Sequence, residues 1–342
     1  MQRRLKFLMA AAALCAAAPA TAGAADGSTA PAQVFFPNPV QSLEDESLTD
    51  QKDADYFSAS AKLRKAYKQV TLTDLDGSGT LTGAYAKVIS ETGTPARDTG
   101  SGFVYTRDED QFEQVMGYYW VTRAQQYIQS LGFGSTLHPV NMRQQLLRID
   151  QFGGDNSFYR DGTKKLTITL GKGGVDDAED GEVIVHEYGH AVQDEQVPGF
   201  GSSPDAGAIG EAFGDYLAVT VSIAATGSTF EQPCVADWDS VSYTPGPIHC
   251  LRRVDSDKHY PEDLHPRREV HADGEIWSAA LWRARQLVGN APLADTIIID
   301  AQFGFAPDTS FQAAAEKTIA TARLYGQDAA FRRAFTERGF IG

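Results

Sequence analysis

The stretch EVIVHEYGHAV, residues 182–192, places two histidines four residues apart, with a glutamate directly after the first. Positions i and i+4 share one face of an α-helix, so His186 and His190 can direct two imidazoles at one ion. Glu187 is displaced from His186 by about 100° around the helix and can reach a water molecule on the ion without ligating it. This spacing is typical of a zinc hydrolase.

The residues around this pair predict a helix buried beneath a cleft. Apolar side chains flank the histidines at positions 183–185 and 191–192. Asp180 and Glu182 supply the negative charge that favours a helix start. Gly189 costs up to about 1 kcal/mol relative to alanine inside a helix, so a requirement other than helix stability favours glycine there.

A tetrahedral catalytic zinc needs a third protein ligand and keeps a fourth position for water. The nearest downstream candidate is GAIGEAFGDYLA, residues 207–218, in which Glu211 and Asp215 are again four apart on an otherwise small and apolar helix. An unpaired carboxylate buried on such a helix would be costly, and ligation of Glu211 would remove that cost. Asp215 could then accept the free N–H of a ligand histidine. The alternative is two surface acids on a polar helix face.

The overall charge narrows the range of partners. The chain has 342 residues and a formal net charge of −15. Such an acidic chain is not expected to bind nucleic acid or an anionic membrane. Apart from the first residues, we expect no apolar run long enough to cross a bilayer.

The N-terminus resembles an export signal. Arg3, Arg4 and Lys6 precede an apolar run at 7–18, and small residues near position 22 fit a cleavage site. We therefore expect residues 1–24 to be a cleaved signal peptide, with an uncleaved anchor as the alternative. The mature protein would be extracellular or periplasmic.

Two cysteines, Cys234 and Cys250, remain after that cleavage. In an exported protein they are expected to form a disulfide, which would stabilise the fold by about 3 kcal/mol. A metal site that combines them with His249 is the alternative.

The element pattern predicts an α+β chain. We expect a loose N-terminal arm at 25–66, a β-rich lobe at 67–195 that ends in the zinc-binding helix, and a helical lobe at 196–342. A hairpin is predicted around Asp76-Gly77, a long helix from 108 to 131, and strands within 141–170, with turns at Gly153-Gly154 and Asp161-Gly162. The stretch 228–268 is predicted to be irregular.

Calcium is the alternative cation at two acidic stretches. Asp74, Asp76, Ser78 and Gly79 resemble the first half of an EF-hand loop, although a turn explains them better because position twelve is Tyr85. The acidic run at 176–180 is a second candidate, and negative charge at a helix N-terminus explains it equally well.

HEYGH followed by GEAFGD resembles the zinc motifs of the gluzincin (thermolysin-like) metallopeptidases, and within them the fungalysin-type (M36) family. Three further segments are similar to that family: FEQVMGYYWVTRAQQYIQSLGF at 112–133, DNSFYRDG at 155–162 and EVHADGEIWSAALW at 269–282. The resemblance runs from about residue 68 to the C-terminus. It implies a two-lobed fold with the active-site cleft between the lobes.

The resemblance also implies roles for single residues. His186, His190 and Glu211 would ligate zinc, and Glu187 would be the general base that takes a proton from zinc-bound water. Asp215 would orient His186, and His271 would stabilise the oxyanion. The strand that begins at Asn156 and Ser157 would hold the substrate backbone.

The sequence departs from the family at two points. Residues 199–207 lack the tyrosine that assists the oxyanion in thermolysin-like enzymes, for which Tyr188, Tyr243 or Tyr260 could substitute. Ser157 stands where the family usually has alanine. His249, His259 and His265 are expected at the surface or in a substrate loop.

These observations predict a secreted, monomeric zinc endopeptidase that acts on proteins or peptides. An exported binding protein, stapled by zinc without catalysis, is one alternative. An aminopeptidase of the same clan is another, although no acidic anchor for a substrate amine is evident in the sequence.

Overall fold

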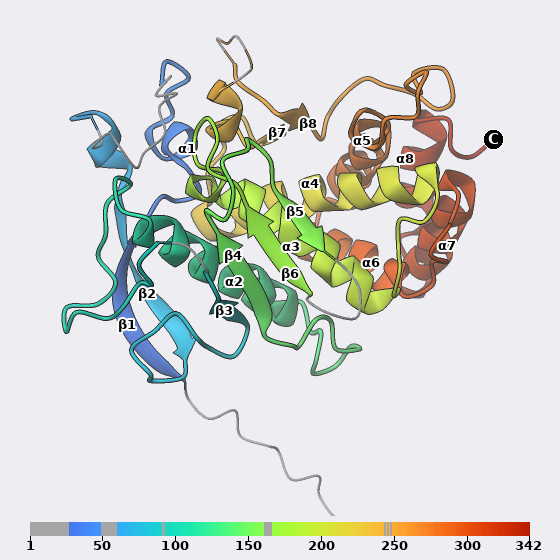
Figure 1. The fold of residues 1–342 in the computed structure, drawn as a ribbon. Coiled ribbons are helices and arrows are strands. Elements are labelled where there is room, and N and C mark those ends of the chain that lie inside the picture. The colour runs from blue at the N-terminus through green and yellow to red at the C-terminus, as the bar shows by residue number, and fades with distance from the viewer. Residues whose placement is uncertain are drawn as a thin grey trace, which may run out of the picture.

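The computed structural model describes residues 27–48, 60–90, 93–160, 166–242, 244, 246 and 248–342. The predicted signal peptide, Tyr243 and the predicted turn at Asp161-Gly162 lie outside these residues. The remainder is an α+β protein of two lobes, with strands gathered in the N-terminal half and helices in the C-terminal half (Figure 1).

The described residues of the N-terminal half hold six strands. A two-stranded sheet pairs β1 with β2, and a four-stranded sheet has the order β3-β4-β6-β5, in which only β5 is antiparallel to its neighbour. The strand bounds are β1 Ser28–Val34, β2 Lys68–Leu75, β3 Ala86–Val88, β4 Gln145–Ile149, β5 Phe158–Arg160 and β6 Thr167–Leu170. The predicted strand at DNSFYRDG is β5, and it lies at an edge of its sheet.

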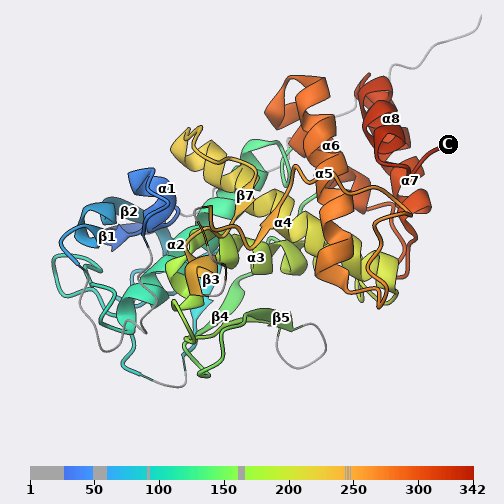
Figure 2. The same cartoon turned by 90° about the horizontal axis from the view of Figure 1, so that it is seen from above.

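The helices dominate the second half. The bounds are α1 Pro39–Leu43, α2 Gln111–Ser130, α3 Gly181–Gln196, α4 Pro204–Thr226, α5 Val270–Val288, α6 Ala291–Gln302, α7 Phe311–Leu324 and α8 Asp328–Glu337. The predicted helix at 108–131 is α2. Helix α4 packs against both α3 and α5, and α2 packs against α3, so α3 joins the two lobes (Figure 2).

The connection from α4 to α5 is largely irregular, as predicted. It contains the short pair β7 (Cys234–Val235) and β8 (Arg252–Arg253) and a 3-10 turn at Asp239–Ser242. The Cys234 and Cys250 sulfurs are bonded to each other, which excludes the metal site with His249. His249 is buried rather than exposed, and its Nδ1 lies 2.8 Å from the Thr244 carbonyl oxygen.

The prediction of a loose N-terminal arm is wrong for residues 27–48. Strand β1 pairs along β2, and both Val34 and Phe35 are fully buried. The Asn38 amide donates to Asp180 and to Asp237, so this segment supplies donors to buried carboxylates. Polar and proline-rich composition hid a strand whose alternate side chains enter the core.

The predicted hairpin is only partly present. A turn follows Leu75, and a single bridge joins Leu75 to Gly83, but β2 pairs with β1 and β3 pairs in parallel with β4. The Asp76 carboxylate accepts the Ser78 backbone N–H, which is the turn interpretation rather than a calcium loop.

The acidic run at 176–180 does not converge on one ion. Glu179 pairs with Arg107 at 2.7 Å, and Asp180 caps α3 by accepting the Glu182 N–H at 2.9 Å. Its members therefore serve different neighbours, so this run does not form a calcium site by itself.

Candidate metal centre and cleft

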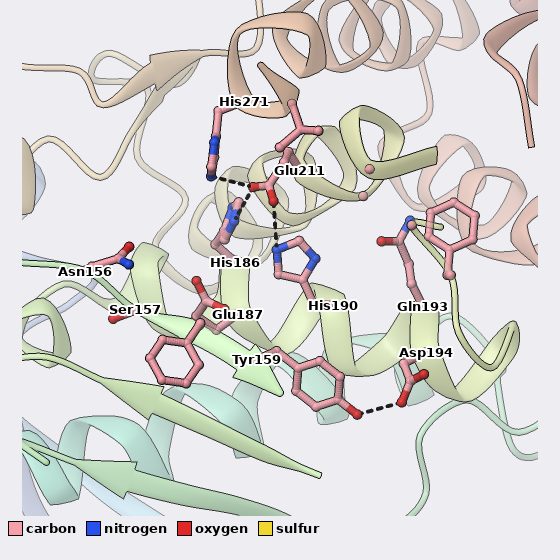
Figure 3. Close-up of a pocket in the computed structure, with 16 residues that line it drawn as sticks. Asn156, Ser157, Tyr159, His186, Glu187, His190, Gln193, Asp194, Glu211 and His271 are labelled. Atoms are coloured by element: carbon pink, nitrogen blue, oxygen red, sulfur yellow. Dashed lines mark hydrogen bonds and ion pairs between the residues drawn. The ribbon is translucent and has the colours of Figure 1, made fainter. Parts of the chain in front are cut away.

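Three predicted zinc ligands converge where α3 meets α4. One donor atom each from His186, His190 and Glu211 lies within 4.8 Å of the other two. The Glu211 carboxylate lies 3.2 Å from His186 Nε2 and 3.7 Å from His190 Nε2. Figure 3 shows both imidazoles, one helical turn apart on α3, facing this carboxylate on α4.

Two glycines allow α3 and α4 to approach closely enough for this convergence. A Cβ atom on Gly189 would lie 2.9 Å from the Gly214 Cα, and a Cβ atom on Gly214 would lie 2.7 Å from His186 Nδ1. Real Cβ atoms do not tolerate such contacts with backbone. Close packing of the two helices therefore explains why glycine stands inside the HEYGH helix.

Asp215 and Arg252 orient the first histidine. His186 Nδ1 lies 2.8 Å from Asp215 Oδ1, and Arg252 donates to both Asp215 oxygens at 2.7 Å. Asp215 accepts the proton on Nδ1, which leaves Nε2 as the ring nitrogen that faces Glu211. Burial alone would raise the pKa of Asp215, but Arg252 and His186 lower it to about 2.

The electrostatics of the cluster favour a cation between its donors. Burial opposes charge on His186, yet Asp215 and Glu211 raise its pKa to about 10. Burial lowers the pKa of His190 to about 4, so its lone pair is available. Burial also opposes charge on Glu211, but the surrounding histidines hold its pKa well below its usual range.

The donor chemistry fits zinc. Two imidazole nitrogens and one carboxylate oxygen form a three-ligand set of the kind that catalytic zinc sites use, with a fourth position left for water or substrate. Asp215 behind His186 supplies the hydrogen bond that such ligands usually have. Within the described part of the chain, no fourth histidine, cysteine or carboxylate has a donor atom within 4.8 Å of all three.

Glu187 lies beside the donor cluster and does not belong to it. Its side chain comes from the helix turn that carries His186 and is 6% exposed. Its Oε2 has no hydrogen-bond partner among the described residues. Burial raises the pKa of Glu187 to about 7, although His186 and the Tyr159 backbone act in the opposite direction.

His271 reaches the cluster from the first turn of α5. Its Nε2 lies 3.2 Å from Glu211 Oε2, and its Nδ1 lies 2.6 Å from Glu269 Oε1. The side chain is 50% exposed, so it stands at the mouth of the site. Glu269 also accepts the N–H groups of His271 and Ala272 and thereby caps the helix.

Asn156 and Ser157 directly precede β5 and line the same cavity as His186 and Glu187 (Figure 3). Asn156 is exposed, whereas the Ser157 hydroxyl donates to Asp177. The serine that replaces the family's alanine is therefore engaged with a buried acid.

The metal centre lies between two hollows. A cavity of about 490 Å³ and a second of about 280 Å³ are both lined by Asn156, Ser157, His186, Glu187 and His271. The larger one extends along α3 to Phe200 and Val270. The two cavities therefore leave space on both sides of Glu187, so that an extended bound polymer could enter on one side and leave on the other.

Two of the three tyrosines considered as substitutes for the oxyanion-assisting tyrosine lie away from the site. Tyr188 is buried and donates to Gln125 on α2, and Tyr260 stacks on Phe340. Neither lines the two cavities.

Sequence reasoning missed Arg252 and Glu269. An acid directly before the VHADGE helix was a visible capping signal for Glu269. Arg252 had no such signal, because it sits in the irregular segment, 37 residues from the carboxylate that it holds.

An HExxH helix between a β-rich lobe and a helical lobe, with a downstream glutamate facing the histidines, defines the thermolysin-like metallopeptidase fold. The model of the fungalysin metallopeptidase (M36) family matches residues 36–304, and the chain belongs to this family. It is therefore a metallopeptidase, and members of this family depend on zinc.

A solved structure with the same fold is the precursor of protealysin, a metalloproteinase from Serratia proteamaculans. The TM-score is 0.53 at 13% sequence identity, and the match covers 84% of this chain and 97% of that one. A search of curated proteins found no match.

Proposed function

We propose that the protein is an exported zinc endopeptidase that hydrolyses internal bonds of proteins or peptides. One observation carries the proposal: a buried carboxylate, Glu187, stands beside a three-donor set and is not engaged in it. A purely structural zinc site needs no adjacent base and prefers four protein ligands. The arrangement thus favours catalysis over a zinc-stapled binding protein.

Zinc held by His186, His190 and Glu211 would act as a Lewis acid on the scissile carbonyl and would lower the pKa of a water molecule. Glu187 would accept a proton from the attacking water and carry it to the leaving amine. Because its Oε2 has no partner among the described residues, this oxygen is available for the transfer.

The surrounding residues position substrate and ligands. His271, at the mouth, donates from Nε2 to the oxyanion that develops on the scissile carbonyl. Glu269 holds the other ring nitrogen. Asn156 and the Ser157 backbone bind the substrate main chain beside β5, and Asp215 with Arg252 keeps His186 in the ligating tautomer.

The two hollows support an endopeptidase, because an internal bond requires room for chain on both sides. An aminopeptidase instead needs an acid for the substrate amine. Asp155, Asp177 and Asp239 line the smaller cavity, so the test must separate the two activities.

Export is supported by the disulfide, since such bonds persist in oxidising compartments. Helix α4 is long and apolar enough to span a membrane, contrary to the expectation from the sequence, but it is mostly buried and carries Glu211 and Asp215. We therefore propose that α4 is a core helix.

The test is hydrolysis of an internally quenched peptide library in two matched forms, one acetylated at the N-terminus and one free. Wild type should cut the acetylated form, lose activity with a zinc chelator and regain it with added zinc. Glu187→Gln should keep zinc and lose turnover by about 10²–10⁴-fold. Cleavage of only the free form would replace the proposal with an aminopeptidase, and full activity of Glu187→Gln would reject the mechanism.

A further inference from the structure

We propose that Asp155, Asp177 and Asp239 form a second metal site, which binds a divalent cation of the size and hardness of Ca²⁺. One carboxylate oxygen from each lies within 4.8 Å of the other two. Calcium–oxygen distances of about 2.3–2.6 Å place two ligands of one ion at most about 5 Å apart, so a single ion can touch all three.

The buried oxygen of Asp177 is a second, independent observation. Asp177 is 2% exposed, and one of its oxygens accepts from the Ser157 hydroxyl. The other, Oδ1, is buried without a hydrogen-bond partner among the described residues. A buried carboxylate oxygen without a partner loses its hydration with nothing in return, and a cation would satisfy it.

The charges around Asp177 point to the same conclusion. Burial raises the pKa of Asp177 well above its usual range, and the neighbouring carboxylates of Asp239 and Asp155 raise it further. Asp239 is 4% exposed, so two of the three acids are removed from water. Like charges held this close favour a bound counter-ion.

The backbone holds the three acids in place before any ion binds. Gly174, with φ +71°, lets its loop approach Asp155 and Ser242, since a Cβ there would lie 2.8 Å from Asp155 Oδ2. The Gly173 N–H donates to the Gly154 carbonyl, and the Val175 N–H donates to Ser242 Oγ at 2.7 Å. Three segments distant in sequence are thereby packed together.

The donor type distinguishes this site from the metal centre. Three carboxylates without nitrogen or sulfur suit hard cations, whereas imidazoles suit zinc. Calcium takes six to eight oxygens in flexible geometry. Water can supply the remainder, because Asp155 is exposed and the cavity of about 280 Å³ opens beside the acids.

The ion would hold in place the start of β5, the strand proposed to bind the substrate main chain. Asp155 directly precedes Asn156, Asp177 holds Ser157, and Asp239 belongs to the α4–α5 connection. A cation shared by the three would tie the start of β5 to both lobes. This inference does not depend on the zinc proposal.

The test uses full-length mature protein carrying Glu187→Gln, which prevents autolysis. Calcium binding is measured by titration calorimetry with zinc loaded, and thermal unfolding is followed with and without calcium. We expect one Ca²⁺ per chain in addition to zinc, and a rise in Tm. Asp155→Asn and Asp239→Asn should each weaken calcium at least tenfold, while the exposed control Asp257→Asn should not.

The exposed Asp155→Asn keeps the test decisive if the buried Asp239→Asn fails to fold, which circular dichroism and zinc content would reveal. Absence of calcium binding would overturn the proposal, and so would binding that Asp155→Asn leaves unchanged. If no calcium binds, and Asp155→Asn introduced without Glu187→Gln loses cleavage before lysine or arginine tenfold, the acids would be assigned to substrate instead. The calcium measurement does not use peptidase activity. Failure of the calcium proposal can therefore be distinguished from failure of the zinc proposal.

Discussion

The molecule holds two clusters of side chains that could each hold a metal ion, and they are built differently. His186, His190 and Glu211 come from two long helices and mix nitrogen with oxygen. Asp155, Asp177 and Asp239 come from a loop and two 3-10 turns and offer oxygen alone. The first cluster has a paired aspartate and arginine behind it, whereas the charges that act on Asp177 are other acids.

This difference assigns the two clusters different ions and different work. Regular helices can fix three protein ligands and leave the fourth coordination position open to water or substrate, which suits a catalytic metal. Loops joined by carboxylates suit a hard ion that holds chain segments together. The two sites should therefore respond independently to substitution and to chelators.

The strongest test of that independence compares one variant that should lose only zinc with another that should lose only calcium. His190→Ala should abolish zinc binding and peptidase activity but leave calcium affinity within about twofold, because its ring is absent from the acidic site. Asp239→Asn should weaken calcium binding and leave zinc binding unchanged. Metal analysis after dialysis measures both ions in one sample, and joint loss of zinc and calcium in either variant would show that the clusters are coupled.

The disulfide should matter more for the acidic cluster than for the zinc cluster. Replacing both Cys234 and Cys250 by alanine should cost about 3 kcal/mol of unfolding free energy, since the bond closes the segment that carries Asp239. Urea unfolding in the Glu187→Gln background measures it. A loss below about 1 kcal/mol would mean that β7–β8 pairing and burial already fix this segment.

Asp215→Asn tests the support of the zinc cluster alone. The amide cannot serve Arg252 and His186 as the carboxylate does, so zinc affinity should fall by about 10–100-fold. Competition with a chromogenic chelator measures it. The control Asp300→Asn changes an aspartate on α6 that accepts the Tyr325 hydroxyl, and it should leave zinc affinity unchanged.

The zinc cluster could be predicted because helical spacing is visible in sequence. The i, i+4 pairs in α3 and α4, and the acid that caps α3, depend on residues within a few positions of one another. The long α2 was predictable for the same reason, whereas the edge strand β5 was expected from the resemblance of DNSFYRDG to the M36 family. Strand partners were not, because β2 could pair with the following segment or with β1, and only tertiary packing decides.

The acidic cluster and the arginine could not be found in that way. Asp239 lies 62 residues beyond Asp177, and Arg252 lies 37 beyond Asp215, and both sit in the irregular connection that follows α4. Such contacts follow from how loops close over the core. The sequence showed an acidic run at 176–180, but not that only Asp177 of that run would join two distant acids.

Gly189→Ala is the smallest change that should disturb the zinc cluster and spare the acidic one. The new Cβ would meet the Gly214 backbone at 2.9 Å, which forces α3 and α4 apart. Overpacking costs about 1–3 kcal/mol, and the gain in helix propensity returns up to about 1, so we expect a net loss of about 1 kcal/mol. The control Gly153→Ala adds a Cβ with nothing within 4 Å and should change stability by less than about 0.5 kcal/mol. Chemical denaturation of both variants, with zinc and calcium affinities measured alongside, tests this. A stabilised Gly189→Ala that retains zinc affinity would mean that the helices yield without moving their ligands, and close packing would then not explain the glycine.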